Sequence, residues 1–156
     1  AELNKDKSFL SLTAEKRAEI LLIVKLVRDA DKLENLLKFK ENNRLGFFNM
    51  REELIISPYI IESFNKKKLA DIRGIKIRDH SVFDSVIWTI CWEFELFFKE
   101  SKKYLRDIGF NPFVVKFMRK VAEEIFEQDK TQLNSYNYVL GIIDNIEETL
   151  QNEVLY

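Results

Sequence analysis

Two aspartates, Asp29 and Asp31, directly follow the most apolar run of the chain, Ile20–Val27, which has one polar residue in eight. Asp31 continues the helix face of Val24 and Val27, at spacings of seven and four residues. Burying an ionised carboxylate alone costs on the order of several kcal/mol, so each one needs a cation, a metal or hydrogen-bond donors. On this pattern, a metal or phosphate site and satisfaction by a neighbouring base or backbone amide are equally good interpretations.

The helix that carries both aspartates is predicted to begin at the N-cap Thr13 and to end near Lys40. A surface helix shows a single apolar stripe, whereas the run Ile20–Val27 is apolar nearly all round. We therefore expect this helix to lie at the centre of the fold and to be the most buried of the long helices.

The rest of the chain shows helical signals and no sustained strand alternation. Four glycines and two prolines are few for 156 residues, which favours long helices over an all-β domain. Further helices are predicted from Ser57-Pro58 to about residue 65, from the capping pair Ser81 and Asp84 to about residue 100, over 102–107, from Asn111-Pro112 onwards, and from about 131 to 152. The predicted fold is all-α, a single helical domain over residues 1–156 with about six helices.

Composition argues against several classes of function. The net charge is -1, and the basic segment 65–78 has no aromatic residue to stack on a base, so we expect no nucleic-acid partner. The apolar segment 82–98 contains three acidic residues, which predicts a buried helix and no membrane association. The single cysteine, Cys91, is expected in the core, and with the polar N-terminus it indicates a cytoplasmic protein. The single histidine, His80, excludes a His-rich metal site built from this chain alone. It lies near a predicted helix start and is expected to be a surface or capping residue.

The segment VRDADKLEN, residues 27–35, resembles the last motif of the HD-domain metal-dependent phosphohydrolases. In that superfamily the aspartate of an "ADKL" helix completes a metal site begun by an upstream His and a His-Asp pair. The resemblance puts the metal-ligand role on Asp31 and places Asp29, Lys32 and Asn35 on the substrate side. Asp84 followed by WEFELFF, residues 92–98, is similar to the C-terminal helix of a bacterial HD subgroup. The resemblance covers roughly residues 15 to 101 and implies an HD-domain-like bundle.

The upstream His and His-Asp motifs of the superfamily are not found before Asp31, and His80 follows Asp79 in the reverse order. We therefore expect the chain to be the C-terminal portion of a longer HD-type phosphohydrolase, acting on a nucleotide or another phosphate ester and inactive on its own. The complete protein would hold a divalent metal such as Mn, Mg or Fe, whereas this chain alone would bind none tightly. The alternative is a non-catalytic helical binding or assembly module that retains an HD scaffold.

The run Ile20–Val27 also predicts a partner, because seven large aliphatic side chains need to be covered. The cover would come from the missing N-terminal half or from a homo-oligomer through this helix. A phosphorylated small molecule is the other expected ligand, since it is what the HD resemblance implies as substrate.

Overall fold

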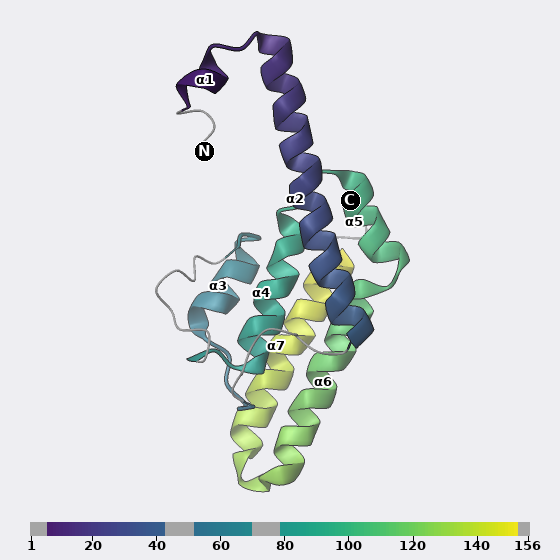
Figure 1. Ribbon diagram of the computed structural model, residues 1–156. Coiled ribbons are helices and arrows are strands. Elements are labelled where there is room, and N and C mark those ends of the chain that lie inside the picture. Colours follow the sequence, from purple (N-terminus) through teal and green to yellow (C-terminus); the bar gives the residue numbers. More distant parts are fainter. Residues whose placement is uncertain (1–5, 43–51, 70–78, 153–156) are drawn as a thin grey trace.

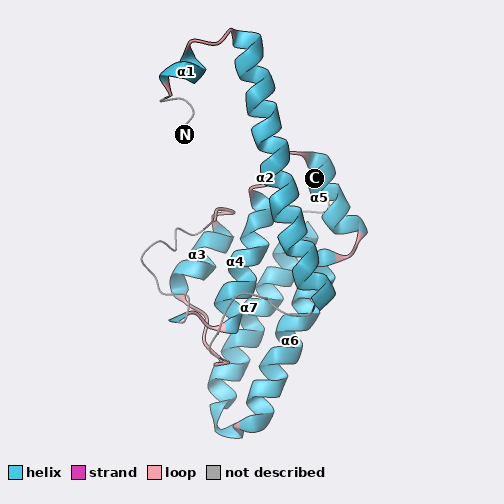
Figure 2. Cartoon of the chain, viewed as in Figure 1, coloured by secondary structure: helices cyan, strands magenta, loops and turns pink. Residues whose placement is uncertain are grey.

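The computed structural model describes residues 6–42, 52–69 and 79–152 of the chain. Helices account for 82% of these residues, and no strand is found in the three ranges. Figure 2 shows the same result, with helices and no strand in the described part of the chain. The prediction of an all-α helical bundle is therefore confirmed.

Seven α-helices and one 3-10 helix make up the described part, and Figure 1 shows their arrangement. They are α1 (Lys7–Leu10), α2 (Ala14–Asn42), α3 (Pro58–Asn65), α4 (Val82–Phe94), α5 (Lys99–Asp107), α6 (Phe110–Gln128), η3 (Lys130–Gln132) and α7 (Leu133–Asn152). Helices α6 and α7 form an antiparallel hairpin, α3 packs on α4, and only the C-terminal half of α2 lies against the bundle.

The core lies between α4, the α6–α7 hairpin and the second half of α2. Ten of the thirteen residues of α4 are buried, so α4 is the central helix of the bundle. Phe39 anchors α2 to α6, because its ring meets those of Phe110, Phe113 and Phe117 edge-on at centroid distances of 5.2–6.4 Å. Edge-to-face ring contacts of this kind add to the apolar burial that joins the two helices.

The local start signals of three helices are confirmed. The Thr13 hydroxyl accepts a hydrogen bond from the Lys16 amide, as an N-cap does. Helix α3 spans Pro58–Asn65, as the Ser57-Pro58 signal predicts. At the start of α4, Ser81 and Asp84 form a complete capping box.

Replacing Ser81 by alanine is expected to lower the free energy of unfolding by about 1 kcal/mol, the usual cost of losing an N-cap. The Ser81 hydroxyl accepts from the Asp84 amide at 3.0 Å and donates to the carbonyl of Ile55, so both bonds are lost together. Urea denaturation followed by circular dichroism would measure the change. Ser135→Ala is the matched comparison, since Ser135 lies within α7 and no side-chain hydrogen bond of it occurs in the described structure. An unchanged stability in Ser81→Ala would contradict this role.

The predicted end of α4 near residue 100 is wrong. The helix ends at Phe94, and a separate helix, α5, begins at Lys99. The amides of Phe97 and Phe98 donate to the Asp29 side chain instead of continuing the helix ladder. A contact from a distant part of the chain therefore accompanies the break between the two helices.

The expectation that α2 is the central and most buried helix is also wrong. Its first half extends beyond the bundle, as Figure 1 shows, and its large aliphatic side chains are exposed. We call Leu21, Leu22, Ile23, Leu26 and Val27 the exposed stretch; their exposed fractions run from 38% to 63%. Helix α2 is continuous over Ala14–Asn42, but the described part of the bundle packs only against the second half of α2. No helix in the described residues is long and apolar enough to cross a membrane.

Candidate functional site

Asp29 and Asp31 lie on opposite sides of α2 and have different surroundings. Asp29 is 2% exposed, and its two carboxylate oxygens accept the amides of Phe97 at 2.9 Å and Phe98 at 3.0 Å. Phe98 is the N-cap of α5, so this carboxylate faces the positive end of a helix dipole. The buried charge of Asp29 is satisfied by backbone amides, and in this structure the residue joins α2 to the α4–α5 loop.

Lys32 belongs to the same junction. It is 9% exposed, and its ammonium donates to the backbone carbonyl of Glu95 at 3.2 Å and to the Glu95 carboxylate at 3.4 Å. Arg28 approaches the same carboxylate at 3.7 Å. Lys32 therefore holds Glu95 beside the loop whose amides donate to Asp29.

Asp31 has the opposite environment, because its side chain is exposed. The Asn35 amide donates to the backbone carbonyl of Asp31 at 2.9 Å. Within the described ranges, no hydrogen bond or ion pair reaches the Asp31 carboxylate itself. No cluster of three or more His, Cys, Asp or Glu side chains that could hold a metal occurs in this part of the chain. Asp31 therefore offers a single oxygen ligand at the surface, and the prediction that it continues a core face is wrong.

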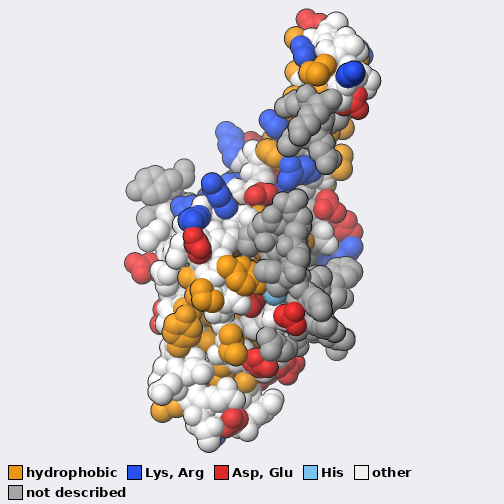
Figure 3. Space-filling model, turned by 90° about the vertical axis from the view of Figure 1, so that its left-hand side faces the viewer, with side chains coloured by type: hydrophobic (Ala, Val, Ile, Leu, Met, Phe, Trp, Pro, Cys, Tyr) orange, Lys and Arg blue, Asp and Glu red, His pale blue; other side chains and the backbone are white. Residues whose placement is uncertain are grey.

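The surface around Asp31 is apolar and basic. Val27, one helical turn before Asp31, is the most exposed member of the exposed stretch. On the neighbouring side of α2, the Lys25 ammonium and the Arg28 guanidinium lie 5.5 and 5.2 Å from the centre of the Phe97 ring. Figure 3 shows hydrophobic side chains along the protruding part of the molecule, between lysine and arginine side chains.

A second group of polar side chains lies at the start of α4, and the sequence did not predict it as a cluster. His80 directly precedes the N-cap of α4, which confirms its predicted place near a helix start, but it is 4% exposed, so its interpretation as a surface residue is wrong. Asp84 accepts the amide and hydroxyl of Ser57, each at 2.7 Å. The Tyr59 ring lies 6.2 Å from that of His80, and burial, together with the charge of Asp84, raises the pKa of Tyr59. The capping pair Ser81 and Asp84 was the only signal in the sequence that pointed to this group.

His80 is too far from Asp31 to share a site with it. The contacts of α2 with Glu95 lie at the C-terminal end of α4, whereas His80 precedes its N-terminal end. Thirteen helical residues span about 20 Å. Cys91, between these ends, is fully buried, and burial raises the pKa of its thiol to about 11, which confirms a core role.

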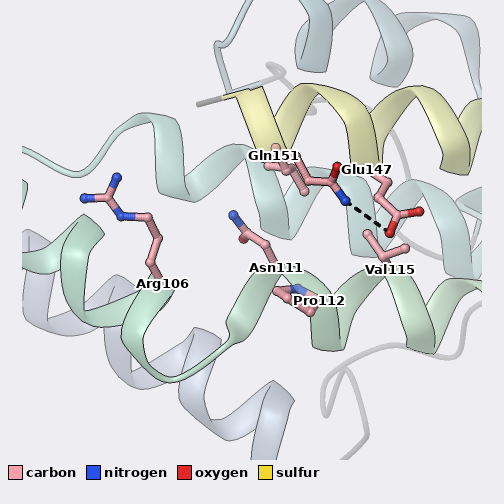
Figure 4. Close-up of a pocket in the computed structure, with 7 residues that line it drawn as sticks. Arg106, Asn111, Pro112, Val115, Glu147 and Gln151 are labelled. Atoms are coloured by element: carbon pink, nitrogen blue, oxygen red, sulfur yellow. Dashed lines mark hydrogen bonds between the residues drawn. The ribbon is translucent and has the colours of Figure 1, made fainter. Parts of the chain in front are cut away.

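A pocket of about 290 Å³ lies where the α5–α6 junction meets the end of α7 (Figure 4). The Gln151 amide donates to Glu147 at 3.5 Å, while Glu147 also receives the Arg119 guanidinium at 2.7 Å. The buried side-chain oxygen of Asn111 has no hydrogen-bond partner in the described structure. The walls hold no nucleophile with an adjacent base. The lining residues are Arg106, Asn111, Pro112, Val115, Glu147, Leu150 and Gln151.

Comparison with protein-family models, curated proteins and solved structures found no match for this chain. The fold and the site define an all-α bundle with one protruding helix that carries an exposed apolar stretch and a free carboxylate. The predicted roles of Asp31 as metal ligand and of Asp29, Lys32 and Asn35 at the substrate side stay predictions.

Proposed function

We propose that this chain is the Asp31-bearing helical part of an HD-type metal-dependent phosphohydrolase that acts on a nucleotide or another phosphate ester and is inactive on its own. The observation that carries the proposal is the contrast between the two aspartates of the VRDADKLEN motif. Both carboxylate oxygens of Asp29 already accept backbone amides. The carboxylate of Asp31 is exposed and makes no hydrogen bond or ion pair within the described residues. The ligand role assigned by resemblance thus falls on the carboxylate that is free to take it.

One carboxylate does not make a metal site, and the described residues do not supply the rest. Asp31 fits as one hard oxygen ligand for Mg²⁺ or Mn²⁺. When bound in a complete site, such a metal polarises a phosphate and lowers the pKa of bound water. The role of this chain is to present Asp31 on α2. Contacts of Phe39 with α6 and of Asp29 with the α4–α5 loop hold α2 in place.

The exposed stretch supports the need for a partner at this surface. Full burial of a large aliphatic side chain stabilises by about 1.5–3 kcal/mol, so covering five half-exposed ones would contribute about 5 kcal/mol. Because Asp31 follows Val27 by one turn on the same face, a segment that covers Val27 also reaches Asp31. A covering segment that carries imidazoles would complete the metal site.

The second candidate is a non-catalytic helical binding or assembly module. It uses the same exposed stretch but has no metal at Asp31. The exposure of five large aliphatic side chains on one helix, which offer a surface to a partner, supports it. The two candidates differ in one respect that can be measured, which is whether Asp31 binds a divalent ion.

Titration of the isotopically labelled chain with Mn²⁺ is expected to broaden the amide resonances of residues 28–34 selectively, because the bound ion is paramagnetic. The affinity should be weak, since a lone carboxylate holds such an ion with most of its waters still bound. Asp31→Asn should abolish the broadening. Asp107→Asn should leave it unchanged, because Asp107 is an exposed carboxylate paired with Lys103.

Three outcomes would count against the proposal. Absence of selective broadening would favour the non-catalytic module. Submicromolar Mn²⁺ binding that is lost in Asp31→Ala would show that the chain alone holds a complete site. Hydrolysis of 4-nitrophenyl phosphate by the chain alone, at a rate that Asp31→Asn reduces, would contradict its inactivity.

A further inference from the structure

One face of α2 looks away from the bundle. Asp29, Lys32, Leu36 and Phe39 are buried against the rest of the chain, which fixes the side of α2 that faces inward. Helical spacing puts Val27 and Asp31 on the other side. Another helix can therefore approach this outer face without displacing any described element of the bundle.

The outer face is patterned along its length. Helical spacing places Lys16, Ile20, Ile23, Val27 and Asp31 on it, at intervals of three or four residues. One end of the face has Lys16, flanked around the helix by Arg17, Glu15 and Glu19; the middle is apolar, and the other end has Asp31. Lys16 and Asp31 are exposed, so both charges are free to meet a partner. The patterned part is about 22 Å long at 1.5 Å per residue.

This pattern is complementary to itself in one orientation only. If two copies of α2 lie antiparallel with the middles of their apolar runs together, Ile23 of one copy lies beside Val24 of the other. Lys16 of each helix then lies opposite Asp31 of the other. In a parallel pair, Asp31 would face Asp31 and Lys16 would face Lys16, which is repulsive at both ends.

We propose that two copies of this chain pair antiparallel through the outer face of α2, with Asp31 of each copy facing Lys16 of the other. The interface is isologous, as the contact of a two-fold dimer must be. A single helix face of this length buries less surface than the interfaces of stable complexes do. The dimer is therefore reversible, with a dissociation constant in the micromolar range.

The inference goes beyond the proposed function and does not rest on it. Pairing neutralises Asp31 with Lys16, so in a paired copy the Asp31 carboxylate is not free to bind a metal. The dimer and the metal-binding form are then alternative states of the same surface. The Mn²⁺ titration is therefore read on Ile23→Lys, which places a charge in the apolar middle, adds no carboxylate and stays monomeric at the concentration that the resonances need. Its result is independent of the dimer.

Sedimentation velocity over a concentration series tests the pairing. The unmodified chain should pass from monomer to dimer in the micromolar range. Val27→Asp should raise the dissociation constant at least tenfold, because it places a charge from each copy in the apolar middle. Lys16→Glu and Asp31→Lys should each raise it about threefold to tenfold, as expected for exposed ion pairs that occur twice in the dimer.

The double variant Lys16→Glu/Asp31→Lys decides the orientation. It reverses the lysine–aspartate pair at both ends and should bring the dissociation constant back towards that of the unmodified chain. Lys116→Glu, at an exposed position of α6, should have no effect. A monomer at every concentration, a dimer unaffected by Val27→Asp, or a double variant as weak as the sum of its parts would overturn the proposal. Circular dichroism would verify that each variant is folded.

Discussion

Replacing Asp29 by alanine is expected to lower the free energy of unfolding by about 3 kcal/mol, one of the two largest effects that we expect. The carboxylate accepts two backbone amides, from Phe97 and Phe98, and hydrogen bonds to a charged group are worth about 1.5–3 kcal/mol each. Part of the lost hydrogen-bond energy is recovered, because the freed amides of Phe97 and Phe98 are only partly buried and can bind water. Urea and thermal denaturation followed by circular dichroism would measure the loss.

Asp31→Ala is the matched control, two residues along the same helix. Its carboxylate is exposed and has no partner in the described structure, so its removal should change the free energy of unfolding by less than about 0.5 kcal/mol. The loss of unfolding free energy in Asp29→Asn should lie between those of Asp29→Ala and Asp31→Ala, because the asparagine side chain keeps one acceptor oxygen. Equal losses in Asp29→Ala and Asp31→Ala would contradict the division of roles between the two aspartates.

Phe39→Ala is expected to cost about 3–5 kcal/mol, the range for removing a buried phenylalanine. The side chain is 2% exposed and contacts three rings of α6. Its loss would leave a cavity at the point where α2 joins the bundle. We expect unfolding at a much lower urea concentration, with the fluorescence and circular dichroism transitions still coincident.

The control for Phe39 is Val27→Ala in the other half of the same helix, measured where the chain is monomeric. Val27 is 63% exposed, so its truncation should cost less than about 0.5 kcal/mol. A large loss in Val27→Ala at that dilution would mean that the first half of α2 is packed within the monomer. A small loss in Phe39→Ala would mean that the second half is not anchored through its aromatic contacts.

Much of the helical structure could be predicted from short-range chemistry. The caps at Thr13 and Ser81, and the Pro58 start, act within a few residues, so the sequence alone located them. The stripe of Val114, Met118, Val121 and Ile125 also faces the core as its spacing predicts. The end of α4 was missed because the group that binds the freed amides, Asp29, lies 68 residues away from Phe97.

Sequence by itself determined the all-α fold, the position of the long helix and the order of its apolar run and two aspartates. Helical periodicity fixes which residues share a face, but it does not say which face meets the rest of the chain. Only the tertiary structure decided that Asp29 is buried on two amides, that Asp31 is free, and that Leu22 and Val27 are exposed. The reason is physical: burial depends on how far the neighbouring helices reach along α2, and that reach is set by contacts between residues far apart in the chain.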